Sequence, residues 1–126
     1  ARTMIGNHAH IVATKRVEFG RSVLTADRLF VSDNRHTFED PSVPVRDQGL
    51  TQLAEVTIGD GSWIGENVCI SGASVGAHCV IAANSVVTRD IPDHCVAAGA
   101  PARIVKRYCE RREGWYRTDA QGSFSE

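Results

Sequence analysis

Residues 56–71 read VTIGDGSWIGENVCIS, and in this stretch an isoleucine followed by a small residue recurs every six positions, at Ile58, Ile64 and Ile70. A half-buried strand alternates with a period of 2 and a helix with a period of 3.6. A period of six therefore predicts a short strand and a tight corner, repeated along the chain.

The same pattern extends outward from this stretch in both directions. Eleven aliphatic, aromatic or Thr positions follow it with small deviations, and nine of them precede Gly, Ala or Ser: Ile5, Ile11, Phe19, Thr25, Val31, Ile58, Ile64, Ile70, Val75, Ile81 and Val87. Stacked coils of this kind bury a column of side chains that a single coil cannot bury alone. The sequence predicts an all-β solenoid over residues 1–101. A β-sandwich is disfavoured, since the turns recur more often than the 8 to 12 residues or so typical of that fold.

The repeat is irregular at two steps and interrupted once. The step from Ile70 to Val75 is one residue short, and a longer step after Ile11 predicts a two-residue bulge at 13–16. Between Val31 and Val56 the period is absent and the sequence is polar and contains prolines, so residues 32–55 are predicted to form a loop extruded from one corner.

The residues after the repeat have a different composition. Residues 102–113 favour a helix, which we expect to cap the open end of the solenoid. Residues 114–126 are polar and are expected to form a tail without regular structure.

Composition excludes several classes of function. The 126 residues contain 14 Lys+Arg and 15 Asp+Glu, so gross charge does not favour a nucleic-acid partner. No stretch approaches the roughly 20 apolar residues of a membrane span. The four cysteines include no CxxC pair, and no signal-peptide pattern opens the chain, so we expect reduced thiols in a cytoplasmic protein.

Three runs in residues 56–106 carry a resemblance to a known family. They are IGxxxWIGxxV, VIAANSVV and AAGAPARIV, and they resemble the hexapeptide-repeat acyltransferases, above all the sugar O-acetyltransferases of the maltose/galactoside and capsule/O-antigen type. The resemblance implies a left-handed parallel β-helix with three hexads per coil, assembled as a homotrimer. It also implies transfer of an acetyl group from acetyl-CoA to a hydroxyl of a small acceptor, with a sugar as the first candidate.

The extruded loop contains a candidate catalytic base. Moving an acetyl group from a thioester to a hydroxyl requires a group that accepts a proton near neutral pH, as imidazole does. His36 lies in the loop, and in the resembling family a loop at this place carries the catalytic histidine. A carboxylate on the second ring nitrogen would fix its tautomer. Asp33 is favoured for this role, with Glu39 and Asp40 as alternatives.

The resemblance also implies a donor site. Trp63, Gly65 and Glu66 match the string that flanks the thioester end, and Ala83 matches the first Ala of a corner in which Asn84 replaces a Gly. Cations match the family's positions near the phosphates, which is sensible for a polyphosphate ligand. The cations are Arg89, which follows the matching Thr88 near the pantetheine and pyrophosphate, and Arg103 and Lys106, near the adenosine phosphates.

Two other classes of function remain as alternatives. A non-catalytic trimeric scaffold is compatible with the five-residue step and with Glu66 at the thioester end. A metal-dependent hydratase on the same fold would require a histidine triad, which the spacings of His8, His10, His78 and His94 do not predict. We therefore expect these four histidines at corners or outward positions and expect no metal.

Overall fold

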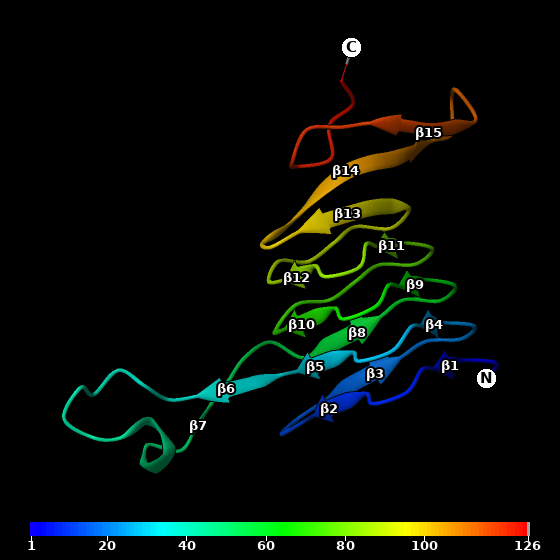
Figure 1. Cartoon of the computed structure of the whole chain (residues 1–126). Helices are drawn as coiled ribbons and strands as arrows, with labels where there is room; N and C mark the ends of the chain where they lie inside the picture. Colours follow the sequence, from blue (N-terminus) through cyan, green and yellow to red (C-terminus); the bar gives the residue numbers. More distant parts are fainter. Residues whose placement is uncertain (126) are drawn as a thin grey trace.

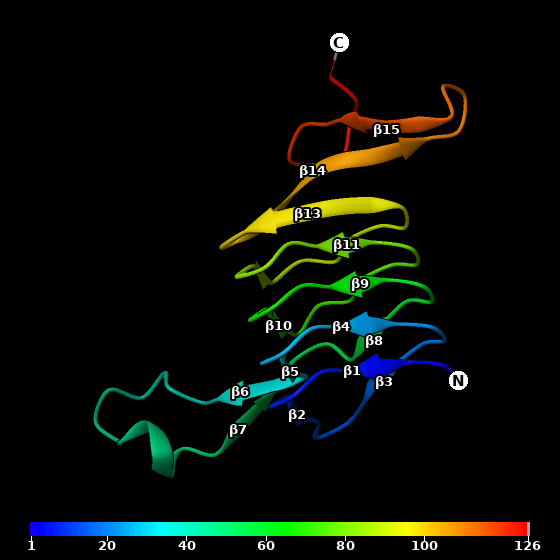
Figure 2. The same cartoon turned by 45° about the vertical axis from the view of Figure 1, so that its right-hand side comes forward.

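The computed structural model describes residues 1–125, and in it the chain winds into stacked coils (Figures 1 and 2). The coils have three faces, and on each face the strands of successive coils pair in parallel. Sheet A contains β1 (Met4–Ile5), β4 (Leu24–Thr25), β9 (Trp63–Ile64), β11 (Val80–Ile81) and β13 (Cys95–Gly99). Sheet B contains β2 (His10–Val12), β5 (Phe30–Ser32), β10 (Cys69–Ser71) and β12 (Val86–Val87). Sheet C contains β3 (Val17–Phe19) and β8 (Val56–Ile58) and is continued by single bridges at Val75 and Ile91. The predicted solenoid of short strands is confirmed.

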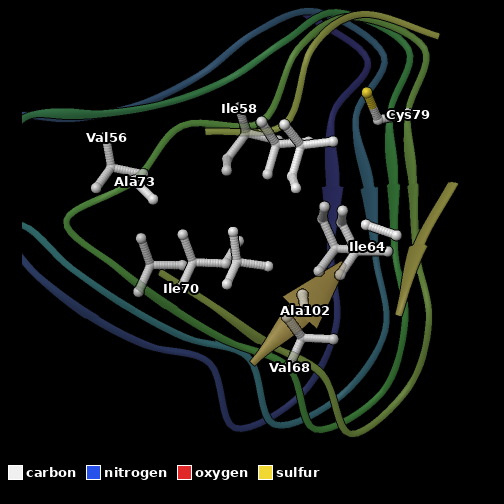
Figure 3. Packing of buried hydrophobic residues seen from close by; sticks show 14 of the residues in the cluster. Val56, Ile58, Ile64, Val68, Ile70, Ala73, Cys79 and Ala102 are labelled. Atoms are coloured by element: carbon white, nitrogen blue, oxygen red, sulfur yellow. The ribbon is translucent and has the colours of Figure 1, made fainter. Parts of the chain in front are cut away.

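The residues that mark the six-residue repeat form the core. On sheet B, Ile70 pairs with Val31 on one side and Val87 on the other, and all three side chains are fully buried. Figure 3 shows Ile58, Ile64 and Ile70 pointing inward from the three faces. Ile5 and Ile11 remain 42 % and 40 % exposed, because they lie on the first coil, where only one side of the stack covers them. Burial of this aliphatic column is the main stabilising contribution that the structure shows.

The small residues that follow the inward positions lie against the backbone of the next coil. A Cβ atom on Gly59 would lie 2.5 Å from the Ala77 nitrogen and the Gly76 carbonyl carbon, so the two coils would have to separate. At corners, by contrast, the backbone is left-handed, and Asn67 and Asn84 adopt φ of +59° and +62° at equivalent places. Asn tolerates this conformation better than most residues, which accounts for Asn84 where the family pattern has Gly.

We expect Gly59→Ala to lower the free energy of unfolding by about 1 to 3 kcal/mol, since overpacking against rigid backbone forces the coils apart. Urea denaturation followed by circular dichroism would measure the change. Gly114→Ala is the matched control, because its added Cβ would meet only the ring of Tyr116, at 3.2 Å. Equal losses for the two variants would contradict this account of the repeat.

Between β5 and β8 the chain leaves the stack. β6 (Asn34–His36) and β7 (Leu50–Gln52) pair antiparallel, and a single 3-10 turn, η1 (Val45–Asp47), lies between them. Figures 1 and 2 show this hairpin and its tip projecting away from the coils.

The expected helix at 102–113 is wrong. The chain reverses after β13 and forms β14 (Ala102–Cys109), antiparallel to β13, and then β15 (Gly114–Arg117), antiparallel to β14. The free edge of β13 offers unpaired backbone groups, and pairing with it outweighs the helical propensity of these residues. Ala102 and Ile104 alternate inward onto the core, so the antiparallel strands cap the solenoid.

The expectation of an irregular tail at 114–126 is also wrong in part. Residues 114–117 form β15, and Thr118 bridges Phe124. Within residues 1–125 no helix is long and apolar enough to cross a membrane. All four cysteines are free thiols in the same described part of the chain.

Candidate active site

His36 ends β6, lies opposite Leu50 of β7 and is exposed. It lines a cavity of about 410 Å³ between the hairpin and the outer side of sheet B. The cavity is also lined by His10, Val12, Phe30, Ser32, Arg35 and Ser71, among others. An exposed imidazole beside an open cavity can exchange a proton with a molecule bound there.

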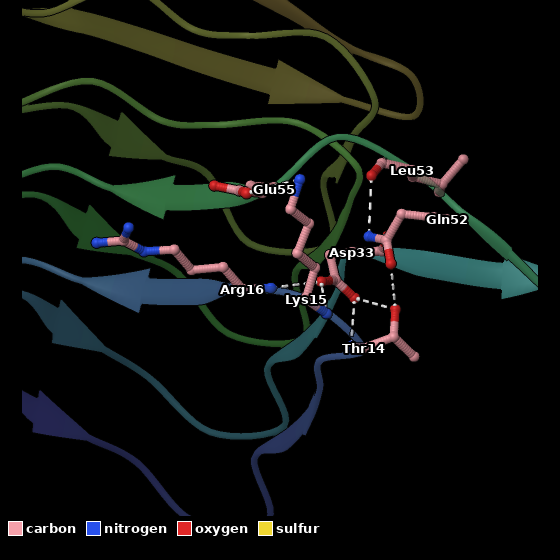
Figure 4. A network of polar contacts seen from close by, with 7 residues as sticks. All are labelled: Thr14, Lys15, Arg16, Asp33, Gln52, Leu53 and Glu55. Atoms are coloured by element: carbon pink, nitrogen blue, oxygen red, sulfur yellow. Dashed lines mark hydrogen bonds and ion pairs between the residues drawn. The ribbon is translucent and has the colours of Figure 1, made fainter.

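Asp33 begins the excursion that leads to His36, and its side chain is completely buried. One carboxylate oxygen accepts hydrogen bonds from the backbone N–H of Thr14 (2.9 Å) and the side-chain amide of Asn34 (2.9 Å). The other accepts from the backbone N–H groups of Lys15 (2.8 Å) and Arg16 (2.7 Å). Figure 4 shows the carboxylate aimed at this corner of the first coil, the place where the sequence predicts a bulge.

These hydrogen bonds determine the protonation state of Asp33. Burial alone would raise the pKa of the carboxyl, but the donors from Thr14, Asn34, Lys15 and Arg16 outweigh it and hold the pKa well below its ordinary value. Asp33 is therefore a carboxylate throughout the neutral range.

The expected role of Asp33 as the group that orients His36 is not what the structure shows. Both Asp33 oxygens are occupied by the four donors above, and no hydrogen bond joins Asp33 to His36 among residues 1–125. The alternatives are also engaged elsewhere: Glu39 accepts from Arg35 at 2.6 Å, and Asp40 accepts from Ser42. Backbone N–H groups that need an acceptor at the corner explain why the carboxylate turns away from the imidazole.

Asp33 makes stability depend on pH. Its pKa is lower in the folded than in the unfolded chain, so its stabilising contribution is complete above the unfolded value, near 3.9, and is lost as pH falls below it. We expect Asp33→Asn to lower the free energy of unfolding at pH 7 by about 1.5 to 3 kcal/mol, the contribution of a hydrogen bond to a charged group.

The difference in the free energy of unfolding between Asp33→Asn and the wild type should narrow as pH falls from about 4 to 2. Urea titrations at a series of pH values would measure it, with the exposed Asp47→Asn as the control. A difference that stayed constant with pH would contradict the assignment of the charge to Asp33.

The residues expected at the thioester end fall around the corner between sheets A and B. Gly65 and Ala83 are brought together: a Cβ on Gly65 would lie 2.7 Å from the Ala83 nitrogen. Glu66 is exposed beside them and forms an ion pair with Arg28 at 3.8 Å. Trp63 faces outward on sheet A and is 51 % exposed. His36, in contrast, lies beyond sheet B, so one chain does not unite Trp63 with the histidine.

Two of the expected phosphate-binding cations are brought together. Arg89 and Arg103 line one cavity of about 190 Å³, next to the exposed Thr88. Lys106 lines a separate cavity of about 480 Å³ with Arg117, its register partner on β15. Sequence reasoning missed Arg117, since the expected irregular tail gave no reason to place it beside Lys106.

Sequence reasoning also missed His10 and Phe30 as neighbours of His36. They are paired in register on β2 and β5, and their rings meet edge to face at 5.4 Å. The signal was present, because each residue directly precedes an inward aliphatic residue of the same face. The interpretation of His10 as an outward residue is correct, but that outward face is the one that the hairpin overlooks.

Within residues 1–125 no group of three or more His, Cys, Asp or Glu side chains is placed to hold a metal ion. The rings of His78 and His94 lie tilted to each other at a different corner, with their centroids 6.0 Å apart, and His94 also neighbours Tyr108.

The fold and the repeat define a hexapeptide-repeat protein, and comparisons with known proteins agree. Residues 55–89 match the family described as bacterial transferase hexapeptide (six repeats). An Escherichia coli K12 protein, provisionally named a lipopolysaccharide biosynthesis O-acetyl transferase, is 34 % identical over 88 % of this chain and 60 % of its own length. The galactoside O-acetyltransferase of the same organism is 36 % identical over 86 % of this chain and 53 % of its own.

Among solved structures, a galactoside acetyltransferase in complex with coenzyme A superposes with a TM-score of 0.61 and 26 % identity, over 99 % of this chain and 72 % of that one. The resemblance to the hexapeptide-repeat acyltransferases is confirmed, and with it the left-handed β-helix. The chain spans 34 % and 60 % of the length of the first two curated relatives that it matches.

Proposed function

We propose that the protein transfers an acetyl group from acetyl-CoA to a hydroxyl of a sugar, with His36 as the general base. The observation that carries the proposal is the position of His36 on a projecting hairpin beside a 410 Å³ cavity. The similarity of the chain to proteins named lipopolysaccharide and galactoside O-acetyltransferases supports the reaction class and the sugar acceptor.

The reaction requires one proton to move twice. The His36 imidazole accepts the proton of the acceptor hydroxyl while that oxygen attacks the thioester carbonyl carbon. As the carbon–sulfur bond breaks, the imidazolium returns the proton to the departing thiolate, so the products are an acetyl ester and free CoA. No carboxylate is hydrogen-bonded to the imidazole among the described residues, so His36 is proposed to act without an orienting acid from its own hairpin.

The cations offer a place for the phosphates of CoA. Arg89 and Arg103 share one cavity, and Lys106 and Arg117 share another. Guanidinium groups form charge-assisted hydrogen bonds with phosphate oxygens, and two to three cations suit a polyphosphate. A galactoside acetyltransferase of similar fold has been solved in complex with coenzyme A, which supports coenzyme A as the ligand.

We also propose a homotrimer, because a single chain leaves a row of large apolar side chains exposed and keeps Trp63 apart from His36. Met4, Leu24 and Trp63 stand in register along the outer side of sheet A and are 68 %, 47 % and 51 % exposed. Aligned large apolar side chains of this kind mark a surface that another molecule covers. Packing of sheet A of one copy near sheet B of the next would also bring a Trp63 toward a His36.

A cytoplasmic location is part of the proposal. The four free cysteines, three of them buried, suit a reducing compartment.

Calorimetric titration of acetyl-CoA into the purified protein, with the mass in solution determined alongside, tests the proposal without an acceptor. We expect saturable binding at one site per chain of a trimer, and weaker binding for Arg103→Ala by about tenfold or more, the loss of one charge-assisted hydrogen bond. A folded trimer that binds no acetyl-CoA would favour the alternative, a non-catalytic hexapeptide scaffold.

A further inference from the structure

The hairpin that carries His36 is fastened to the solenoid at its base. Its outgoing leg leaves at Asp33 and its returning leg arrives at Gln52 and Leu53. The backbone N–H of Leu53 and the side-chain amide of Gln52 both donate to the Asp33 carbonyl oxygen, each at 2.8 Å. The Gln52 amide also donates to the Leu53 carbonyl at 3.0 Å. The two legs are therefore joined at the point where they leave the coil.

A second set of bonds ties the joined legs to the first coil. The Thr14 hydroxyl lies 2.6 Å from the Gln52 side-chain oxygen and 3.2 Å from an Asp33 carboxylate oxygen (Figure 4). The Asp33 carboxylate accepts the backbone N–H groups of residues 14–16. The base of the hairpin, which belongs to the second coil, is thus hydrogen-bonded to the bulge at 13–16 of the first coil.

The returning leg is also confined from the other side. Leu53 passes over Gly72, the left-handed corner of the next coil, where a Cβ atom would lie 2.8 Å from the Leu53 Cβ. The base of the hairpin is therefore held between the corners of the coils below and above it.

Beyond this base the hairpin is stabilised by bonds within itself. The Gln48 amide donates to the Asp40 and Val43 carbonyls, and the Thr37 and Thr51 hydroxyls meet at 2.6 Å. The tip projects away from the stack in both views (Figures 1 and 2). His36 is only three residues from Asp33, so its position over sheet B depends on the direction in which the legs leave the coil.

We propose that Thr14, Asp33 and Gln52 form a latch that positions His36 over its cavity for acyl transfer. This inference rests on the proposed function, and the three are positioning residues that act through the backbone of the hairpin. Reacting groups must be held in a narrow geometry, and a misplacement of about 1 Å costs on the order of a hundredfold in rate.

The chemistry of the latch explains its residue types. The bulge presents three backbone N–H groups to one buried side chain, and a carboxylate, with two accepting oxygens, can receive all of them. An amide would turn a donor toward one of these N–H groups, in a site that is completely buried and offers no water in exchange. Gln52 supplies an oxygen for the Thr14 hydroxyl of the bulge and an amide for the Asp33 and Leu53 carbonyls at the base of the hairpin.

The test uses two exposed members of the latch, since their substitution should leave the fold intact. We expect Gln52→Ala and Thr14→Val to lower kcat with acetyl-CoA and a small galactoside about 10- to 100-fold. Affinity for acetyl-CoA, measured by calorimetry, should stay within twofold of the wild type. Gln48→Ala is the matched control, since it removes the same kind of amide-to-carbonyl bonds at the tip of the hairpin, and Thr14→Ser, which keeps the hydroxyl, should restore kcat.

The outcomes separate this inference from the proposed function. If His36→Ala is inactive but Gln52→Ala keeps the wild-type kcat, or if Gln48→Ala loses as much as Gln52→Ala, the latch is overturned and the function stands. If the wild type gives no turnover, or His36→Ala turns over as fast as the wild type, the proposed function is wrong, and the proposed latch is wrong with it. Reduced kcat with unchanged donor affinity, rescued by Thr14→Ser, supports the latch.

Discussion

Replacement of His36 by alanine is expected to reduce the turnover of acetyl-CoA with a galactoside or maltose acceptor by about a hundred- to ten-thousand-fold. This is the contribution of a positioned general base, and the charged residues nearest to His36 in the hairpin cannot replace it. Arg35 cannot accept a proton, and the carboxylates of Glu39 and Asp40 are engaged with Arg35 and Ser42. The rate of CoA release, together with the mass of the acetylated acceptor, would measure the loss.

Donor binding should survive the same substitution. His36 lies beyond sheet B, whereas Arg89 and Arg103 line a different cavity near the capped end of the solenoid. We expect the Kd for acetyl-CoA to change less than threefold in His36→Ala. His78→Ala, at an exposed residue that lines neither cavity, controls for the loss of any exposed histidine. Full activity of His36→Ala with an accepted sugar would remove the proposed base.

The contrast between Asp33 and His36 shows how far the sequence could predict the site. An acid three residues from a loop histidine suggests a catalytic pair, and the sequence offers no local reason to separate them. The separation arises from a contact 17 to 19 residues away, where the backbone N–H groups of 14–16 require an acceptor. The bulge at 13–16 could be predicted from the longer step after Ile11, but its partner could not, because that partner is set by the stacking of two coils.

The fold was more accessible, because each coil repeats the same local rule. An aliphatic residue followed by a small one identifies both the inward position and the close contact with the next coil, as at Ile58 and Gly59. The rule ends where the stack ends. At residues 102–113 the helical composition is a local preference, and the open edge of β13 is a tertiary feature that no window of sequence contains.

Contacts between residues of neighbouring coils were harder to predict from the sequence than the fold, but easier than the partner of Asp33. His10 and Phe30 become adjacent only when the coils are aligned through the bulge, which shifts the count by two residues. Once the register is known, the residues on the outer side of sheet B are those that directly precede Ile11, Val31 and Ile70. That reading places an aromatic ring and a second imidazole beside His36, and makes the acceptor preference of the cavity testable by substitution.

Truncation of Ile70 to alanine is expected to lower the free energy of unfolding by about 2 to 5 kcal/mol, as large-to-small substitutions in closed cores do. Ile70 is fully buried at the centre of sheet B, between Val31 below and Val87 above. Its neighbours belong to rigid strands that cannot collapse into the space, so the loss should fall toward the upper part of that range. Urea denaturation followed by circular dichroism would give the value.

The form of the transition carries further information. In a stack of repeats each coil contacts only its neighbours, and stability is nearly a sum of coil and interface contributions. A cavity at Ile70 weakens the interfaces between the coil that contains it and the coils on both sides, so we expect the unfolding transition to broaden as well as to shift. Val45→Ala is the control, because this side chain is 46 % exposed on the hairpin and belongs to no column. A loss below about 1 kcal/mol for Ile70→Ala would mean that the aliphatic column does not hold the coils together, contrary to the basis on which the fold was predicted from the repeat.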